Sequence, residues 1–156
     1  MKSMKPTKNA AAIQIKKNAL LSALEGAKNM HPDEFIALFR GEERSNPSGK
    51  TKATDKTKDE KIDRTPDLLL TDLIIPPFAT GDEDSSSYSP YFIPANSREK
   101  ASFHSHPDPD TAYPSDEDLY YFSKESGIHF IACYPFRLQD VACFDYAGNV
   151  IPFKII

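Results

Sequence analysis

The chain has 156 residues, of which 39% are hydrophobic and 27% are charged, and its formal net charge at pH 7 is -4. This length suits a single domain, residues 1–156, that can bury a core without disulfide bonds. The acidic balance excludes the basic footprint of a nucleic-acid-binding domain, so we expect no nucleic-acid partner.

The beginning of the chain predicts a disordered start and then a helix. Residues 1–10 are rich in lysine and are expected to be disordered. Residues 11–30 predict a helix, because apolar side chains recur at helical spacing toward the end of this segment. Residues 13–15 admit a second interpretation, a short strand that leads into the helix. Pro32 then ends the helix, since the residue before a proline disfavours helical backbone.

A short apolar segment and a long charged one come next. Residues 34–41 lie between a proline and a glycine and are mostly apolar, which favours a buried strand over another helical turn. Residues 42–67 carry as many basic as acidic side chains and very few apolar ones. Such a segment cannot bury enough surface to order itself, so we expect a flexible charged insert.

The middle of the chain predicts two strands separated by a loop. Residues 68–75 are largely apolar and are ended by two prolines, which predicts a buried strand. Residues 79–99 are rich in Gly, Asp, Ser and Pro and predict a loop, with a short strand as an option at 88–93. We expect a second strand over 101–106 and a loop over 107–114.

The last part of the chain predicts one helix and three closing strands. Residues 115–126 begin with a serine suited to a helix start and continue with apolar side chains. The strands are expected at 128–134, 140–146 and 150–155, with a hairpin turn at 147–149. This order predicts an α/β fold of the α+β-like kind, a mixed β-sheet flanked by helices.

Cysteine content and hydropathy indicate where the protein works. Cys133 and Cys143 lie among apolar residues without CxxC spacing, which is typical of buried thiols. The N-terminal region lacks the apolar stretch of a signal peptide, and no run of about 18 apolar residues could cross a membrane. We therefore expect a cytoplasmic protein without a membrane partner.

The most informative local pattern is His104-Ser-His106-Pro107, followed by Ser115 and Asp118. Side chains on a strand alternate with period two, so both imidazoles would point to the same face and could reach one ion. Two histidines and a carboxylate leave a fourth position open for water, which is typical of a catalytic zinc site.

Ser115 and Asp118 also have a purely structural interpretation. A serine followed three residues later by an acid resembles a helix-capping pair. The two interpretations are compatible, because a capped helix start would fix the direction of the Asp118 side chain, as a metal ligand requires.

The composite spacing resembles the JAMM (MPN+) metalloprotease signature, HxHP-x7-SxxD. The family also has an upstream glutamate, and residues 31–38 resemble the segment that carries it, which makes Glu34 the candidate. Residues 131–135 resemble small archaeal members of the family. The resemblance implies the JAMM/MPN architecture, which is cytidine-deaminase-like.

The resemblance also implies a role for each matching residue. His104, His106 and Asp118 would bind one Zn²⁺ per chain, which lowers the pKa of water toward about 7. Glu34 would act as general base and acid. Ser115 would hydrogen-bond the developing oxyanion. The substrate would be a peptide or isopeptide bond after the C-terminus of a ubiquitin-like modifier, as in deubiquitinases and desampylases.

Two alternatives use the same scaffold. One is the processing of a sulfur-carrier protein, and the other is a non-catalytic MPN docking module. Docking members of the family usually lack the metal ligands, whereas this chain keeps all of them. The sequence carries no signal for a particular oligomeric state.

Overall fold

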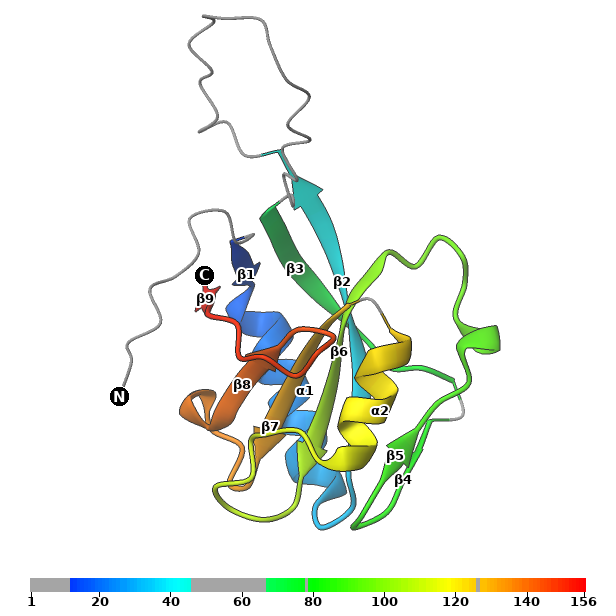
Figure 1. Cartoon of the computed structure of the whole chain (residues 1–156), viewed down its shortest axis with the longest axis vertical. Coiled ribbons are helices and arrows are strands. Elements are labelled where there is room, and N and C mark those ends of the chain that lie inside the picture. The colour runs from blue at the N-terminus through cyan, green and yellow to red at the C-terminus, as the bar shows by residue number, and fades with distance from the viewer. Residues whose placement is uncertain (1–11, 46–66, 78, 126) are drawn as a thin grey trace, which may run out of the picture.

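A mixed β-sheet forms the centre of the molecule (Figure 1). The computed structural model describes residues 12–45, 67–77, 79–125 and 127–156, so the expectations for residues 1–10 and for most of the charged insert lie outside the described residues. The elements in chain order are β1 (Ile13–Ile15), α1 (Lys17–Met30), β2 (Ile36–Arg44), β3 (Asp67–Ile74), β4 (Thr80–Gly81), β5 (Ser86–Ser87), the 3-10 helix η1 (Pro90–Phe92), β6 (Glu99–His106), α2 (Asp116–Lys124), β7 (Ile128–Cys133), the 3-10 helix η2 (Leu138–Asp140), β8 (Val141–Phe144) and β9 (Phe153–Ile155).

The main sheet has seven strands in the order β8-β7-β6-β2-β3-β1-β9. β2 runs antiparallel to both β3 and β6, whereas β6 is parallel to β7 and β1 is parallel to β3 and β9. β4 and β5 form a separate antiparallel pair. The predicted mixed sheet flanked by helices is therefore confirmed.

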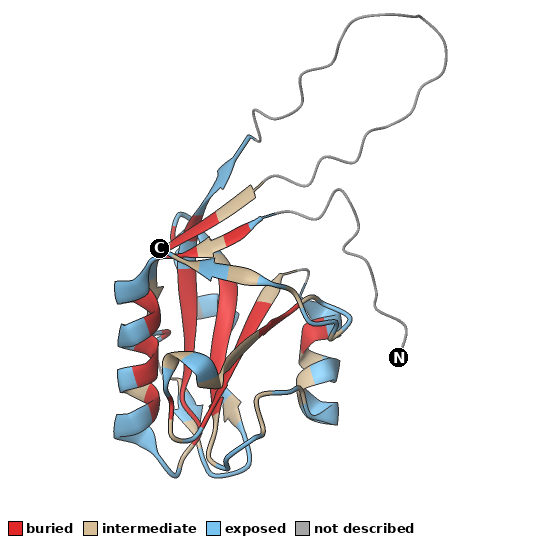
Figure 2. Cartoon of the chain, turned by 90° about the vertical axis from the view of Figure 1, so that its left-hand side faces the viewer, coloured by how far each residue is buried: buried red, intermediate tan, exposed pale blue. Residues whose placement is uncertain are grey.

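The two helices cover opposite faces of this sheet (Figure 2). α1 turns a stripe of small and aliphatic side chains to the core: Ala19, Leu20, Ala23, Leu24 and Ala27. On the other face, Phe122 of α2 is fully buried and packs with Ile131 and Phe144. Among the described helices, none is long and apolar enough to cross a membrane.

Buried phenylalanines hold together the strands that carry the site. The Phe39 ring on β2 lies edge-on to Phe103 on β6, with centroids 5.9 Å apart, and to Phe130 on β7 at 5.5 Å. All three side chains are fully buried, and burial of one such ring stabilises a fold by about 1.5–3 kcal/mol. These contacts hold β6 between β2 and β7, and the three rings belong to the same core cluster as the buried side chains of α1.

Several predicted boundaries differ from the structure. Residues 13–15 form a strand, as the second interpretation proposed, and the helix begins only at Lys17. The expected insert is shorter than 42–67, because residues 42–44 extend β2 and residue 67 begins β3. Pairing between β2 and β3 continues there, from Glu42 opposite Leu69 to Arg44 opposite Asp67, and backbone pairing orders even charged residues.

Two further predictions about strands were wrong. The optional strand at 88–93 is a 3-10 turn over Pro90–Phe92 with a proline at its start, which cannot donate to a strand ladder. The turn at 147–149 is present, with Gly148 at a φ of 80°, but only one bridge, between Phe144 and Val150, follows it. β9 instead pairs with β1, so the last strand closes the opposite edge of the sheet.

Candidate metal centre

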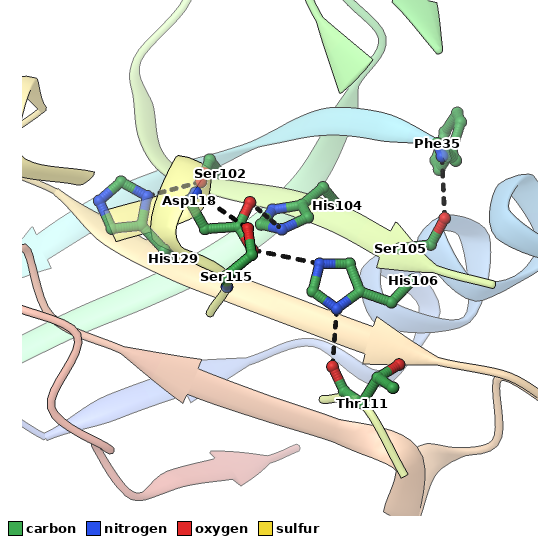
Figure 3. A network of polar contacts seen from close by, with 9 residues as sticks. All are labelled: Phe35, Ser102, His104, Ser105, His106, Thr111, Ser115, Asp118 and His129. Atoms are coloured by element: carbon green, nitrogen blue, oxygen red, sulfur yellow. Dashed lines mark hydrogen bonds and ion pairs between the residues drawn. The ribbon is translucent and has the colours of Figure 1, made fainter. Parts of the chain in front are cut away.

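β6 presents its two histidines on the face of the sheet that α2 covers (Figure 3). His104 is 5% exposed, and the His106 side chain is 12% exposed. Ser105 lies between them in the alternating pattern of the strand and points the other way, where its Oγ accepts a hydrogen bond from the Phe35 backbone N–H at 2.8 Å. The period-two alternation thus places the two histidines on one face of β6 and Ser105 on the other, where Ser105 bonds the segment before β2.

Asp118 reaches the same place from α2. Ser115 is the N-cap of this helix, and its Oγ accepts a hydrogen bond from the Asp118 N–H at 3.2 Å. In return, Asp118 Oδ2 accepts from the Ser115 N–H at 2.8 Å. This capping box satisfies two helix-end donors and fixes the orientation of the Asp118 carboxylate. The structural interpretation of the pair is therefore correct, and it leaves the carboxylate directed at the histidines.

The three side chains bring one donor atom each to a common point, and these atoms lie within 4.8 Å of one another. Asp118 Oδ1 lies 3.0 Å from His104 Nε2, and Asp118 Oδ2 lies 3.2 Å from His106 Nε2. His104 Nε2 is buried and, despite this proximity, has no partner in hydrogen-bond geometry among the described residues. A buried nitrogen without a hydrogen bond is costly, and a bound cation would satisfy it. The set is suited to hold a metal ion.

A backbone carbonyl orients the second histidine. His106 Nδ1 lies 2.7 Å from the Thr111 carbonyl oxygen. Because a carbonyl can only accept, Nδ1 carries a proton, and Nε2 faces Asp118 and the common point, where it can hold either a proton or a metal ion. Metal-binding histidines are held by this kind of outer contact.

The Glu34 carboxyl lies beside the triad, just before β2, and is 8% exposed. Burial raises the pKa of Glu34, His106 and Ser86 lower it, and Asp118 raises it, with a net result of about 7. The backbone next to Glu34 is held on two sides. Ser105 N–H donates to the Phe35 carbonyl at 2.9 Å, and Glu34 N–H donates to the Asp82 carbonyl at 2.6 Å.

Opposite charges inside the triad dominate its protonation. Burial alone would raise the pKa of Asp118, but contacts with His104 and His106 outweigh burial and hold this pKa far below its usual range. Burial would likewise lower the pKa of His106, yet Asp118 and the Thr111 carbonyl raise it above its ordinary value. In the metal-free chain the carboxylate therefore stays ionised and attracts a positive charge, either a proton or a cation.

Three comparisons place this geometry among known proteins. No family model matches the chain. A probable metalloprotease of Haloferax volcanii is 29% identical over 153 residues, which cover 98% of this chain and 85% of that protein. A JAB1/MPN domain protein of Archaeoglobus fulgidus has a TM-score of 0.59 at 26% identity and covers 92% of this chain and 99% of its own. A solved structure described as a JAMM metalloprotease-like zinc site in the proteasome and signalosome has a TM-score of 0.58 at 26% identity, with coverages of 94% and 99%. The fold of this chain is that of JAB1/MPN and JAMM proteins.

The structure brings together all the residues that the sequence singled out. His104, His106 and Asp118 meet at one point, Ser115 adjoins Asp118, and the carboxyl of Glu34 interacts with His106 and Asp118. Their chemical roles remain predictions.

Sequence reasoning missed three supports of the candidate metal centre. Ser105 had a signal, since a small polar residue on the inward face of an apolar strand needs a partner. Thr111 contributes only its backbone carbonyl, so its identity carried no signal. Gly81 lies so close to the Glu34 carbonyl that a Cβ would collide with it, and this contact depends on the unpredicted β4–β5 hairpin.

Proposed function

We propose that the chain is a zinc-dependent metalloprotease that hydrolyses peptide or isopeptide bonds after the C-terminus of ubiquitin-like modifier proteins. One observation carries the proposal: the donor atoms of His104, His106 and Asp118 converge beside the buried Glu34 carboxyl. The Haloferax volcanii relative, a probable metalloprotease, supports the same class of reaction.

The donor set favours zinc with an open position. Two imidazole nitrogens and one carboxylate oxygen are zinc ligands of the catalytic type, which leave the fourth position for water. Zinc held there would act as a Lewis acid that makes water nucleophilic near neutral pH. The complete set also argues against a non-catalytic docking module, which has no use for a buried His-His-Asp cluster beside an acid.

Glu34 is the residue that would move the proton. Its carboxyl has a pKa raised to about 7 by burial, so it can accept a proton from water near neutral pH. As water adds to the scissile carbonyl carbon and the C–N bond breaks, the same carboxyl would return that proton to the leaving amine. A proton acceptor whose pKa is near the working pH suits both steps.

Ser115 would stabilise the negative charge that develops on the carbonyl oxygen. Its hydroxyl accepts a hydrogen bond from Asp118 N–H, which leaves the hydroxyl proton free to be donated. A donor placed at this point in a hydrolase lowers the barrier by about 3–4 kcal/mol.

We also propose that the tail of the modifier lies along residues 79–99. β4 and β5 form a two-stranded sheet separate from the main sheet, and Asp82 between them binds the Glu34 backbone. An extended peptide can add to the free edge of such a hairpin through backbone hydrogen bonds. This placement would carry the end of the tail toward Glu34 and the histidines.

The test uses the purified full chain and linear fusions of ubiquitin-like proteins from the same host. We expect about one zinc per chain by elemental analysis, cleavage directly after the modifier by mass spectrometry, and loss of cleavage on chelation. Glu34→Gln should retain the metal and lose turnover, whereas Glu83→Gln, an exposed acid nearby, should keep both. A zinc-loaded chain that cleaves no fusion, or a fully active Glu34→Gln variant, would refute the proposal.

A further inference from the structure

The segment from β4 to the start of β6 runs beside α2 and has little core of its own (Figure 1). Among its described residues from 79 to 96, no side chain is buried. Such a segment keeps its place through a few contacts with the rest of the molecule. These contacts determine how firmly the β4–β5 hairpin is held beside the candidate metal centre.

Hydrogen bonds fasten the segment near both of its ends. At the hairpin, the Glu34 N–H donates to the Asp82 carbonyl at 2.6 Å. Just before β6, the Arg40 Nε–H donates to the Ser97 carbonyl at 2.8 Å. The part of the segment between these two points needs a contact of its own to stay against the molecule.

A pair of tyrosines joins the middle of the segment to α2. The Tyr88 hydroxyl lies 2.9 Å from the Tyr121 hydroxyl, and the contact is partly buried. Tyr88 directly follows β5, and Tyr121 lies three residues after Asp118, so both α2 side chains are on the same face of the helix. One face of α2 therefore carries a predicted metal ligand and the contact with the segment.

The two hydroxyls depend on each other. Burial raises the pKa of Tyr88 and that of Tyr121, so both phenols keep their protons near neutral pH, and one donates to the other. The Tyr121 ring lies edge-on to His129, with centroids 5.9 Å apart, which fixes its position on α2. Removing one hydroxyl would leave the other without its partner, whereas removing both would cost little.

The tyrosine contact restrains the same part of the chain that adjoins Glu34. Ser86 on β5 lies close enough to the Glu34 carboxyl to lower its pKa, and Tyr88 follows two residues later. Two residues of extended chain span only about 7 Å. A shift of Tyr88 away from α2 would therefore also move the hairpin away from Glu34.

We propose that Tyr88 and Tyr121 are positioning residues for the hydrolysis described above, an inference that rests on that proposed function. Their hydroxyl pair ties the segment to α2 and thereby holds the β4–β5 hairpin where Glu34 and the modifier tail meet. The tail then binds to a hairpin that is already in place, so that binding does not have to order it.

Amide hydrogen exchange of the full chain, followed residue by residue in NMR spectra, tests this restraint without any substrate. Tyr121→Phe should accelerate exchange of the Glu34 N–H, which donates to the hairpin, about tenfold. The Ser105 N–H, which donates to the Phe35 carbonyl at 2.9 Å, should keep its rate. Tyr88→Phe combined with Tyr121→Phe should exchange more slowly than the single variant, because no unpaired hydroxyl remains.

The matched control is Tyr120→Phe, which removes a hydroxyl from the neighbouring residue, 65% exposed, and should change neither rate. The proposal fails if Tyr121→Phe leaves the Glu34 N–H rate unchanged, if the Ser105 N–H accelerates equally, or if the control has the same effect. It also fails if the double variant exchanges faster than the single one, since the rings and not the hydroxyl pair would then hold the hairpin.

Steady-state kinetics on a linear modifier fusion connect the restraint to the tail. Zinc-loaded Tyr121→Phe should show KM raised about fivefold with kcat little changed, because the bound tail itself keeps the hairpin in place. An unchanged KM beside accelerated exchange would overturn the role in positioning the tail. If the native chain cleaves no fusion, the hydrolase proposal fails, and the exchange rates still decide whether the tyrosine pair holds the hairpin.

Discussion

Ser115 offers the sharpest test of the mechanism, because one hydroxyl has a structural and a proposed catalytic role. Ser115→Ala removes the N-cap contact with Asp118 N–H, 3.2 Å long, and should cost about 1 kcal/mol of unfolding free energy. For a chain of this size that lowers Tm by about 2–4 °C. If the hydroxyl also stabilises the oxyanion, kcat should fall by about 10²–10³.

Two companion variants separate these roles. Glycine is a helix N-cap almost as good as serine, so Ser115→Gly should lose only a few tenths of a kcal/mol in stability. It lacks the hydroxyl and should lose as much kcat as the alanine variant. Ser115→Thr keeps a hydroxyl and should retain most of the activity.

The assay for this series is kcat of the zinc-saturated variants on a modifier fusion, with thermal unfolding measured in parallel. A Ser115→Gly variant with nearly full activity, beside an impaired Ser115→Ala variant, would show that the serine acts only by starting α2. In that case the oxyanion role would be withdrawn, and the metal-binding proposal would stand.

Three further predictions concern the supports of the site and a buried histidine. Gly81→Ala should lower kcat by about 10²-fold, because its Cβ collides with the Glu34 carbonyl and displaces the base. Gly127→Ala, whose Cβ makes only ordinary contacts of 3.8 Å and beyond, should be neutral, and equal losses in the two variants would contradict this reasoning. Asp118→Asn should reduce the bound zinc measured by elemental analysis to a small fraction of one per chain, and full metal content would remove this residue from the ligand set. Because burial lowers the pKa of His129 to about 4 in the folded chain, the unfolded chain binds more protons between pH 4 and 6.5. The metal-free protein should therefore lose up to about 3 kcal/mol of unfolding free energy as pH falls through that window, whereas His129→Gln should show a shallower loss in denaturant titrations.

The sequence predicted best the elements whose pattern is both local and repeated. The apolar periodicity of α1 reflects one buried stripe, and the apolar runs of β3 and β7 reflect strands inside the sheet. The site was predictable for the same reason. Alternation on β6 brings His104 and His106 to one face, and the capping box sets Asp118.

What the sequence left open or missed depends on pairing between distant segments. The strand at 13–15 was only one of two interpretations, and the last strand was expected to pair through a hairpin, whereas β9 pairs with β1. Each of these strands has three residues, too few to show a period, and each is ordered by its neighbours in the sheet. The β4–β5 hairpin has only two residues per strand, and its position follows from its contact with the Glu34 backbone. Backbone atoms make that contact, so the identities of the side chains do not predict it.

The Asp118 carboxylate couples the start of α2 to the candidate metal centre, because it takes part in both. Its Oδ2 accepts the Ser115 N–H and also lies 3.2 Å from His106 Nε2. Fraying of the first turn of α2 would therefore withdraw a ligand oxygen, even when the substitution that causes it touches no ligand. Conversely, loading the ion should slow amide hydrogen exchange in that turn, so exchange rates at residues 115–118 would report on occupancy.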